Sequence, residues 1–231
     1  LAEKEIFGED YFNHQLYRNS LQLRNAAKTD TIPVMNEKAS SLSFYQKGAW
    51  ALHFMREKIE WHIDKEIEEA KAGRKAEMII KVNSLSDKGL IKKLYEAAEA
   101  GVEIKMIVRG IFCAVEQKTF KKKIHAISIV DEYLEHSRVM YFYNKGSEDV
   151  YLSSADWMTR NLDYRIEAAV KVNQKNLKKE LKDLLELQLK GNVKARFLDE
   201  DLTNKYVKNN KKLFRSQIET YKFLKKKAIE N

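Results

Sequence analysis

The chain has 231 residues, of which 44% are hydrophobic and 33% charged, and its formal net charge is +9. This length suits one domain or two small ones, with a core that needs no disulfide support. No apolar run approaches the roughly 20 residues that cross a bilayer, and no secretory leader is recognisable, although the sequence starts at Leu1 rather than at methionine. A single cysteine excludes an internal disulfide and a zinc cluster built from cysteines.

The positive charge favours an anionic partner, namely a nucleotide, polyphosphate, nucleic acid or a membrane surface. The lysine runs at 121–123, 211–212 and 225–227 are scattered along the chain, which is typical of solvated faces rather than of one binding patch. Cys113 ends the apolar run 107–113, so we expect a buried, inert thiol, in keeping with a reducing cytoplasm.

The first half of the chain predicts a strand–helix–strand unit. Apolar residues recur at three- and four-residue steps over 49–72, which indicates an amphipathic helix that Gly73 closes. Residues 76–82 read as a buried strand, 87–100 as a helix ended by Gly101, and 103–109 as a second strand. Such a unit is right-handed and its two strands are parallel.

The second half adds strands and two helices. We expect strands at 125–130, 138–143, 149–153 and 165–171, with a hairpin turn at 144–146, a last strand at 193–198, and helices at 174–189 and 214–228. The predicted fold class is therefore α/β, with a mixed sheet flanked by helices. Residues 1–45 are polar, carry the only proline, Pro33, and have too few apolar residues for a core of their own. We expect a helical amino-terminal segment at 1–45 and a second domain at 46–231.

The residues that carry chemistry gather around one histidine. His136 and Arg138 are two positions apart at the start of a predicted strand, so their side chains share one face. Strand ends of an α/β sheet form ligand crevices, and the strand at 149–153 and the one before Arg109 end in polar residues. An imidazole among arginines can attack phosphorus or protonate a leaving oxygen while the guanidinium groups hold the phosphoryl oxygens. The candidates for this site are His136 as the catalytic residue, with phosphate contacts from Arg109, His136, Arg138, Ser153, Ser154, Asp156, Arg160 and Asn161.

Each candidate has a structural alternative. His136 could be a buried histidine bonded to a carbonyl, and Arg109 could pair with a surface carboxylate. Ser153, Ser154 and Asp156 could cap the following segment, since these residue types favour caps and turns. The other histidines are expected at the surface or at the edge of the core, and the nine-residue spacing of the pair at 53 and 62 does not suit a metal site.

Several long runs resemble the last domain of bacterial polyphosphate kinases. They are IIKVNSLSDKGLIKKLYEAAEAGVEIKMIVRGIFC, ISIVDEYLEHSRVMYFYNKG, VYLSSADWMTRNLDYRIEAAV and VKARFLDEDLTNKYV, and the likeness extends over roughly residues 49–225. The run FNHQL…AAKTDTIPVMNEKASSLSFY is more loosely similar to the start of the same family. By this resemblance the beginning and the end of such a protein are joined without its middle, either because the gene is truncated or because the sequence is only part of something longer.

The resemblance implies a phospholipase-D-like fold for 46–231, and reversible transfer of the terminal phosphate of ATP to polyphosphate through a phosphohistidine. It matches Arg109 to the family's ATP-phosphate arginine and His136 to its second essential histidine. The nucleophilic histidine lies in the family's preceding domain, for which this sequence has no counterpart. ATP or ADP with magnesium, and inorganic polyphosphate, are the implied ligands. We expect a cytoplasmic homo-oligomer that binds no specific nucleic acid and has no metal site of its own. Peripheral association with a membrane is compatible with this expectation.

Two other functions stay open. A phospholipase-D-like chain with one histidine motif can complete a phosphodiesterase site by pairing two copies across a two-fold axis. A non-catalytic relative would bind polyphosphate or nucleotide in a salt-dependent way without transferring phosphate.

Overall fold

A strand–helix–strand unit lies at the centre of the fold, as predicted. Every side chain of β1 (Glu77–Val82) is buried, and β1 pairs in parallel with β2 (Glu103–Val108). The connecting helix α4 (Lys88–Ala100) begins where the carboxylate of Asp87 accepts the Leu90 N–H at 3.0 Å. It ends at Gly101, whose φ of 100° is a left-handed conformation that glycine adopts without strain.

The computed structural model describes residues 48–114, 119–165, 167–201 and 203–230, with positions 8, 14, 17 and 18. Two compact units are distinguished, one of residues 1–57 with 160–167 and the other of residues 58–159 with 168–231. The predicted segment 1–45, and its boundary with the domain at 46–231, lie outside the described residues apart from those single positions. In the described part of the chain, no helix combines the length and apolar character needed to cross a bilayer.

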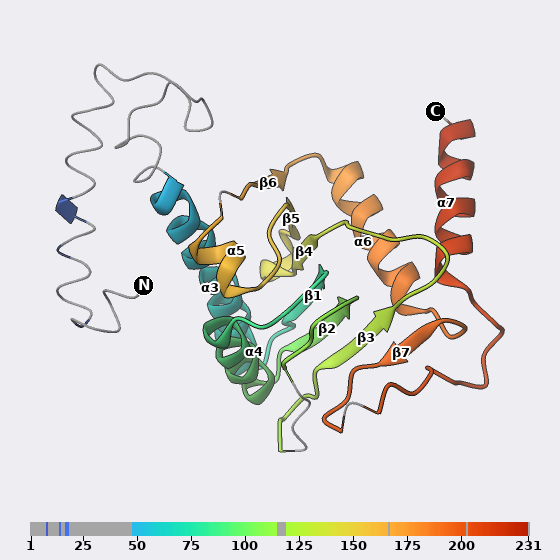
Figure 1. Ribbon diagram of the computed structural model, residues 1–231, viewed down its shortest axis with the longest axis horizontal. Coiled ribbons are helices and arrows are strands. Elements are labelled where there is room, and N and C mark those ends of the chain that lie inside the picture. Colours follow the sequence, from blue (N-terminus) through green and yellow to red (C-terminus); the bar gives the residue numbers. More distant parts are fainter. Residues whose placement is uncertain are drawn as a thin grey trace. The chain divides into compact units, whose positions relative to one another are not determined.

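The sheet of the second unit is mixed, and its order is β6-β5-β4-β1-β2-β3-β7. Strand β3 (His125–Ile129) extends the parallel part, whereas β4 (Val139–Phe142) runs antiparallel to β1. Antiparallel pairings then add β5 (Asp149–Ser153) and β6 (Ala169–Val172) at one edge, and β7 (Ala195–Phe197) at the other (Figure 1). The predicted α/β class with a mixed sheet flanked by helices is confirmed.

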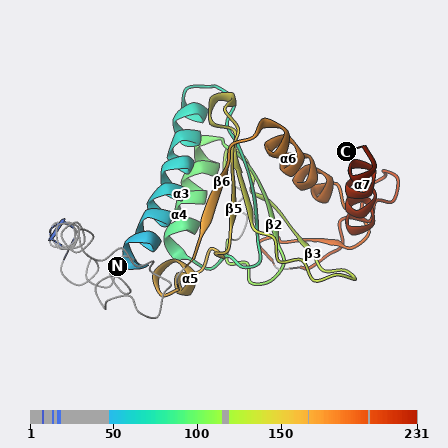
Figure 2. The ribbon, with the colours of Figure 1, turned by 90° about the horizontal axis from the view of Figure 1, so that it is seen from above.

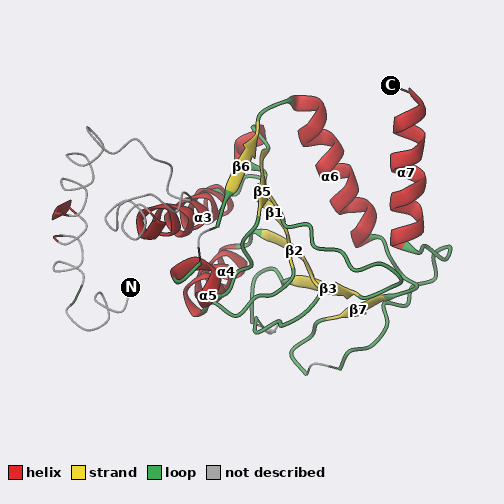
Figure 3. Ribbon diagram, turned by 45° about the horizontal axis from the view of Figure 1, so that its top comes forward, coloured by secondary structure: helices red, strands yellow, loops and turns green. Residues whose placement is uncertain are grey.

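Helices cover both faces of this sheet. Helix α4 and the part of α3 (Gly48–Lys71) from Lys58 onward lie on one face, and α6 (Lys175–Leu189) lies on the other, with α7 (Ser216–Glu230) beside α6 (Figures 2 and 3). On the α6 side, Leu185 packs into a buried cluster with alternate residues of the strands, among them Ile79, Ile107 and Tyr141. This alternation is the two-residue period of a strand that is buried on both faces.

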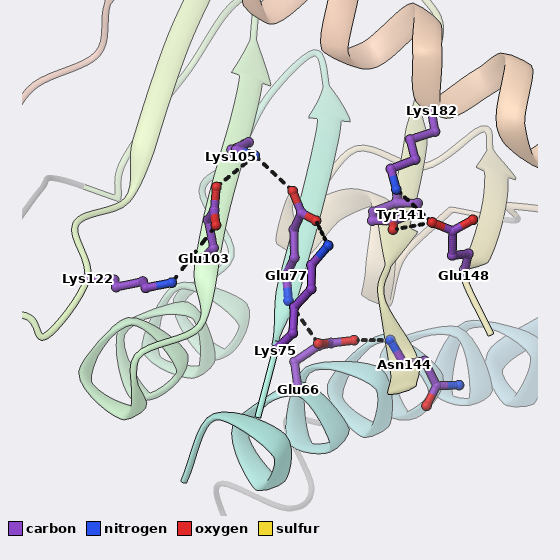
Figure 4. A network of polar contacts seen from close by, with 10 residues as sticks. All are labelled: Glu66, Lys75, Glu77, Glu103, Lys105, Lys122, Tyr141, Asn144, Glu148 and Lys182. Atoms are coloured by element: carbon purple, nitrogen blue, oxygen red, sulfur yellow. Dashed lines mark hydrogen bonds and ion pairs between the residues drawn. The ribbon is translucent and has the colours of Figure 1, made fainter. Parts of the chain in front are cut away.

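Charged residues fix the helices at the amino ends of the central strands (Figure 4). The carboxylate of Glu66 on α3 is fully buried and accepts the backbone N–H of Glu77 at 3.0 Å and of Asn144 at 2.6 Å. On the other face, the ammonium of Lys182 on α6 donates to Glu148 at 2.6 Å, and the same carboxylate oxygen accepts the Tyr141 hydroxyl. These contacts fix the position of each helix along the strands of the sheet.

A buried histidine connects α3 to the antiparallel half of the sheet. Only 2% of His62 is exposed, its ring stacks on Phe142, and its Nε2 lies 2.8 Å from the hydroxyl of Tyr151. Its Nδ1 has no hydrogen-bond partner and lies 3.8 Å from a carboxylate oxygen of Asp149. Burial lowers the pKa of His62 from 6.5 to about 4, because the site disfavours the charged imidazolium.

Acidification should therefore weaken the fold through His62. Between pH 6.5 and about 4 the unfolded chain binds the proton and the folded chain does not, so folding stability falls as the pH falls through this window. We expect a contribution of about 1 to 3 kcal/mol. Urea unfolding at several pH values, for the native chain and for His62→Gln, measures it. The difference between the two curves should grow with pH over this window, and a constant difference would contradict the assignment.

Three local expectations were wrong. Cys113 is exposed, because the neighbouring Phe112 bridges to Leu85 and points inward while Cys113 points outward. His62 lies in the core rather than at its edge. The strand expected at 165–171 covers only Ala169–Val172, and the short helix α5 (Thr159–Asp163) precedes it. The turn expected at 144–146 is present.

Candidate functional site

Four segments bring polar side chains to one edge of the sheet. The parallel strands β1, β2 and β3 end here, β5 ends here because it runs in the same direction as β1, and β4 starts here. Asn83 follows β1, Arg109 follows β2, residues 130–138 join β3 to β4, and Asp156 follows β5. The carboxyl edge of the sheet is therefore where the predicted residues meet.

Arg138 and Asp156 form an ion pair at this edge. The guanidinium donates from Nε to Oδ1 at 2.9 Å and from Nη2 to Oδ2 at 3.2 Å. Asp156 is buried, and its Oδ1 also accepts the backbone N–H of Asn83 at 2.7 Å and of Ser84 at 3.2 Å. This carboxylate already accepts four donors, so it orients Arg138 and ties β5 to the end of β1.

Two guanidinium groups hold the backbone at His136. Arg109 donates from Nη1 to the carbonyl of Glu135 at 2.8 Å, and Arg138 donates from Nη1 to the carbonyl of His136 at 3.2 Å. The imidazole of His136 is exposed and forms no hydrogen bond with the described residues. The alternative of a buried, carbonyl-bonded histidine is therefore wrong. Among the described residues Arg109 pairs with no carboxylate, so the surface ion pair considered for it is not seen.

Asn83 belongs to the same cluster and was missed from the sequence. In the amide orientation that satisfies both its polar atoms, its oxygen accepts from Arg138 at 2.9 and 3.1 Å, and its nitrogen donates to the carbonyl of Glu135 at 3.1 Å. An asparagine placed directly after the central strand was the available signal. The side chain of Glu135 was missed as well. Burial alone would raise the pKa of Glu135. Hydrogen bonds from Lys81, Gln217 and Gln188 nevertheless hold that pKa below its usual value.

The two serines serve the backbone. The hydroxyl of Ser153 accepts the N–H of Ala155 at 3.0 Å, and that of Ser154 accepts the N–H of Ala168 at 3.0 Å. These are the turn contacts that were considered as the alternative to phosphate binding. A phosphate contact from either serine stays a prediction.

Arg160 and Asn161 lie on α5, within the other compact unit. Arg160 is exposed, and the buried amide of Asn161 donates to Glu167 at 2.7 Å. The structure thus brings His136, Arg109, Arg138 and Asp156 together, whereas the place of Arg160 and Asn161 relative to them stays a prediction. In the described residues no group of three or more His, Cys, Asp or Glu is arranged to hold a metal ion.

A cavity of about 670 Å³ lies beside the cluster. Its walls are mainly apolar side chains of α6 and α7, and Glu135 and Ser137 of the 130–138 segment line one side. Glu135 therefore faces the cavity with its carboxylate, while its carbonyl accepts the guanidinium of Arg109.

Comparisons with known proteins agree on one family. Residues 50–217 match the model of the polyphosphate kinase C-terminal domain 2. The chain is 48% identical over 165 residues to a polyphosphate kinase of Yersinia pestis and 43% identical to that of Escherichia coli K12, in each case over 71% of this chain and 24% of the relative.

A crystal structure of polyphosphate kinase from Porphyromonas gingivalis superposes with a TM-score of 0.74 at 46% identity, and covers 77% of this chain and 28% of that one. The chain thus spans about a quarter of the length of these relatives. Because the family model matches most of its length, the chain belongs to the polyphosphate kinase family and contains that family's second C-terminal domain.

Proposed function

We propose that this chain supplies the phosphate-binding half of a polyphosphate kinase site, which acts on ATP and inorganic polyphosphate. The observation that carries the proposal is the exposed His136 ring on a backbone held by two guanidinium groups, Arg109 at 2.8 Å and Arg138 at 3.2 Å. The relatives named above support the substrate class, since they are polyphosphate kinases.

In this half-site, Arg109 contacts phosphoryl oxygens with the guanidinium nitrogens that do not bind the Glu135 carbonyl. Arg138 is neutralised by Asp156 and holds the shape of the site. A guanidinium suits this task better than an ammonium because its planar fork contacts two oxygens at once. Magnesium belongs to the substrate, as the ion carried by the phosphates of ATP.

His136 is the proton-transferring residue of the proposed reaction. Transfer of the γ-phosphoryl group breaks the bond between Pγ and the bridging oxygen of ADP and forms a bond to the acceptor. An exposed imidazole is able to donate a proton to the leaving oxygen, or to stabilise its charge. A second group must attack phosphorus, and the family resemblance assigns that nucleophile to a segment outside this sequence. The chain alone is therefore expected to bind but not to transfer phosphate.

Arg109→Ala should weaken binding of tripolyphosphate by about 10- to 100-fold, because one charge-assisted contact to an anion is lost. Isothermal titration calorimetry at fixed, low salt measures the dissociation constant. Arg196→Ala is the matched control. Its guanidinium also donates from Nη1 to a backbone carbonyl, that of Asn204 at 2.7 Å, but on β7 at the edge of the sheet. Equal losses for both variants would show that only overall charge matters, and would overturn the half-site.

A further inference from the structure

We propose that the start of α7 acts as a clasp that positions His136, and that Gln217 and Arg215 are positioning residues for the site. This inference rests on the proposed function for its chemistry, although the clasp itself is a matter of contacts. The segment that carries His136, residues 130–138, has no regular secondary structure. Its Tyr133 and Leu134 are 63% and 70% exposed, so the segment has little packing of its own to hold it.

Arg215 fixes the beginning of the segment. Its guanidinium donates to the carboxylate of Asp131 from Nε at 2.9 Å and from Nη2 at 2.8 Å, and it reaches Glu132 at 3.0 Å. The side chain of Asp131 is only 1% exposed. The hydrogen bond from Arg215 holds the pKa of Asp131 below its ordinary value. A two-pronged pair of this kind fixes orientation as well as distance.

Gln217 holds the middle of the segment through its backbone. The side-chain oxygen accepts the N–H of Tyr133 at 2.9 Å, and the side-chain nitrogen donates to the carbonyl of the same residue at 2.8 Å. The amide of Gln217 thus satisfies both backbone groups of one loop residue, as a neighbouring strand would. Gln217 is 7% exposed, so water competes little for these bonds.

Glu135 connects the clasp to the site. Its carboxylate accepts from Gln217 at 3.1 Å, from Gln188 of α6 at 2.9 Å, and from the ammonium of Lys81 at the end of β1. Lys81 and Gln188 are themselves buried and bonded to each other at 2.8 Å. The carbonyl of Glu135 accepts Arg109, and the next residue is His136. One residue therefore links α7 and α6 to the arginine and the histidine of the site.

The start of α7 is itself attached to the end of α6. The carboxamide of Asn192, just after α6, accepts the N–H of Phe214 at 2.7 Å, and its backbone N–H donates to the carbonyl of Phe214 at 3.0 Å. Gly191 lets the two helices meet, because a Cβ there would lie 3.2 Å from the side chain of Ser216 and 3.1 Å from the carbonyl of Gln188. The start of α7 thus cannot move without moving the end of α6.

The position of His136 matters because catalysis of phosphoryl transfer depends mainly on how the protein positions its groups around the phosphate, and little on covalent chemistry by the protein. A displacement of about 1 Å can cost about 100-fold in rate. Gln217 and Arg215 provide this placement through bonds to the backbone and carboxylates of the 130–138 segment. Helix α7 therefore takes part in positioning the residues of the site.

The test compares Gln217→Ala with Lys222→Ala in the full chain. Lys222 lies on the same helix and, among the residues that the structure describes, pairs only with Glu219, at 2.7 Å, so its loss leaves the clasp intact. The readouts are amide hydrogen exchange over 131–138, the NMR signals of the carbon-bound ring protons of His136, and tripolyphosphate binding. Gln217→Ala should speed exchange at Tyr133 and its neighbours, shift or broaden the His136 signals, and weaken binding by about three- to tenfold. Lys222→Ala should change none of them.

Arg215→Lys is the second variant, chosen because it keeps the charge and loses the two-pronged geometry, so it tests the clasp if Gln217→Ala does not fold. Unchanged exchange and unchanged His136 signals in the folded variants would overturn the clasp. Faster exchange with unchanged tripolyphosphate affinity would overturn its positioning role. If the native chain binds no tripolyphosphate, the proposed function fails, whereas the exchange and NMR results still decide whether the clasp holds His136.

Discussion

Asp156→Ala is expected to lower the free energy of unfolding by about 2 to 4 kcal/mol, because it removes one partner of a partly buried ion pair and the acceptor of two backbone N–H groups. Those groups are the amides of Asn83 and Ser84, and the remaining guanidinium is Arg138. Urea denaturation followed by circular dichroism measures the loss. The same variant should also loosen the carboxyl edge of the sheet, so that His136 loses its support.

Two further variants separate the hydrogen bonds from the charge. Asp156→Asn keeps Oδ1 as an acceptor for the two amides and removes the negative charge, so we expect a smaller loss of about 1 to 2 kcal/mol. Asp183→Ala is the surface control. It breaks an exposed pair with Lys179 one helical turn away, which should cost less than about 1 kcal/mol. A loss at Asp156 no larger than the loss at Asp183 would contradict the role given to the buried carboxylate.

Glu66→Ala is the second substitution with a large expected effect, again about 2 to 4 kcal/mol, because one buried and one partly buried N–H group lose their acceptor. The amides of Glu77 and Asn144 belong to β1 and to the turn after β4, and Figure 4 shows how the single carboxylate reaches both. Equilibrium unfolding in urea measures this loss. Glu57→Ala is the control, since Glu57 is an exposed residue of the same helix and such a surface change should stay within about 0.5 kcal/mol. Equal losses for the two variants would contradict the anchoring role.

The pH dependence of Glu66 runs opposite to that of His62. Burial raises the pKa of Glu66 above its ordinary value of 4.5, so the folded chain binds a proton that the unfolded chain has lost. Its contribution to stability is therefore greatest below 4.5 and declines as the pH rises through the folded value. Glu66→Gln does not titrate, so its stability relative to the native chain should improve as the pH rises over that range. A relative stability independent of pH would contradict the raised value.

The parallel core of the fold followed from local patterns. Residues 77–82 and 103–108 are short apolar runs separated by a capped helix that ends in glycine. This pattern commonly forms a right-handed unit with two parallel strands. The patterns were less informative at the antiparallel edge. Strand β6 has three exposed residues out of four, so its sequence carried no burial signal to mark where it begins. Helix α5 is too short for a helical period to show.

The candidate site was foreseen in part. The spacing of His136 and Arg138 and the family resemblance pointed to the 130–138 segment, and strand order then brought Arg109 and Asp156 to the same edge. The serines were assigned as phosphate contacts from their place at a strand end and from the family resemblance, and the turn contacts of their hydroxyls could not be read from the sequence. Nor could the sequence distinguish the outward Cys113 from the inward Phe112, because both belong to one apolar run.

The sequence by itself determined the family, the α/β class and the order of the central elements, because those depend on residue patterns within a few positions of one another. Only the tertiary structure decided which distant residues share a hydrogen bond. Gln217 and Tyr133 are 84 positions apart, as are Arg215 and Asp131, and Lys81 and Glu135 are 54 apart. Nothing in a linear pattern records such pairs, since they arise when the sheet brings the ends of separate strands to one edge and two helices cover one face.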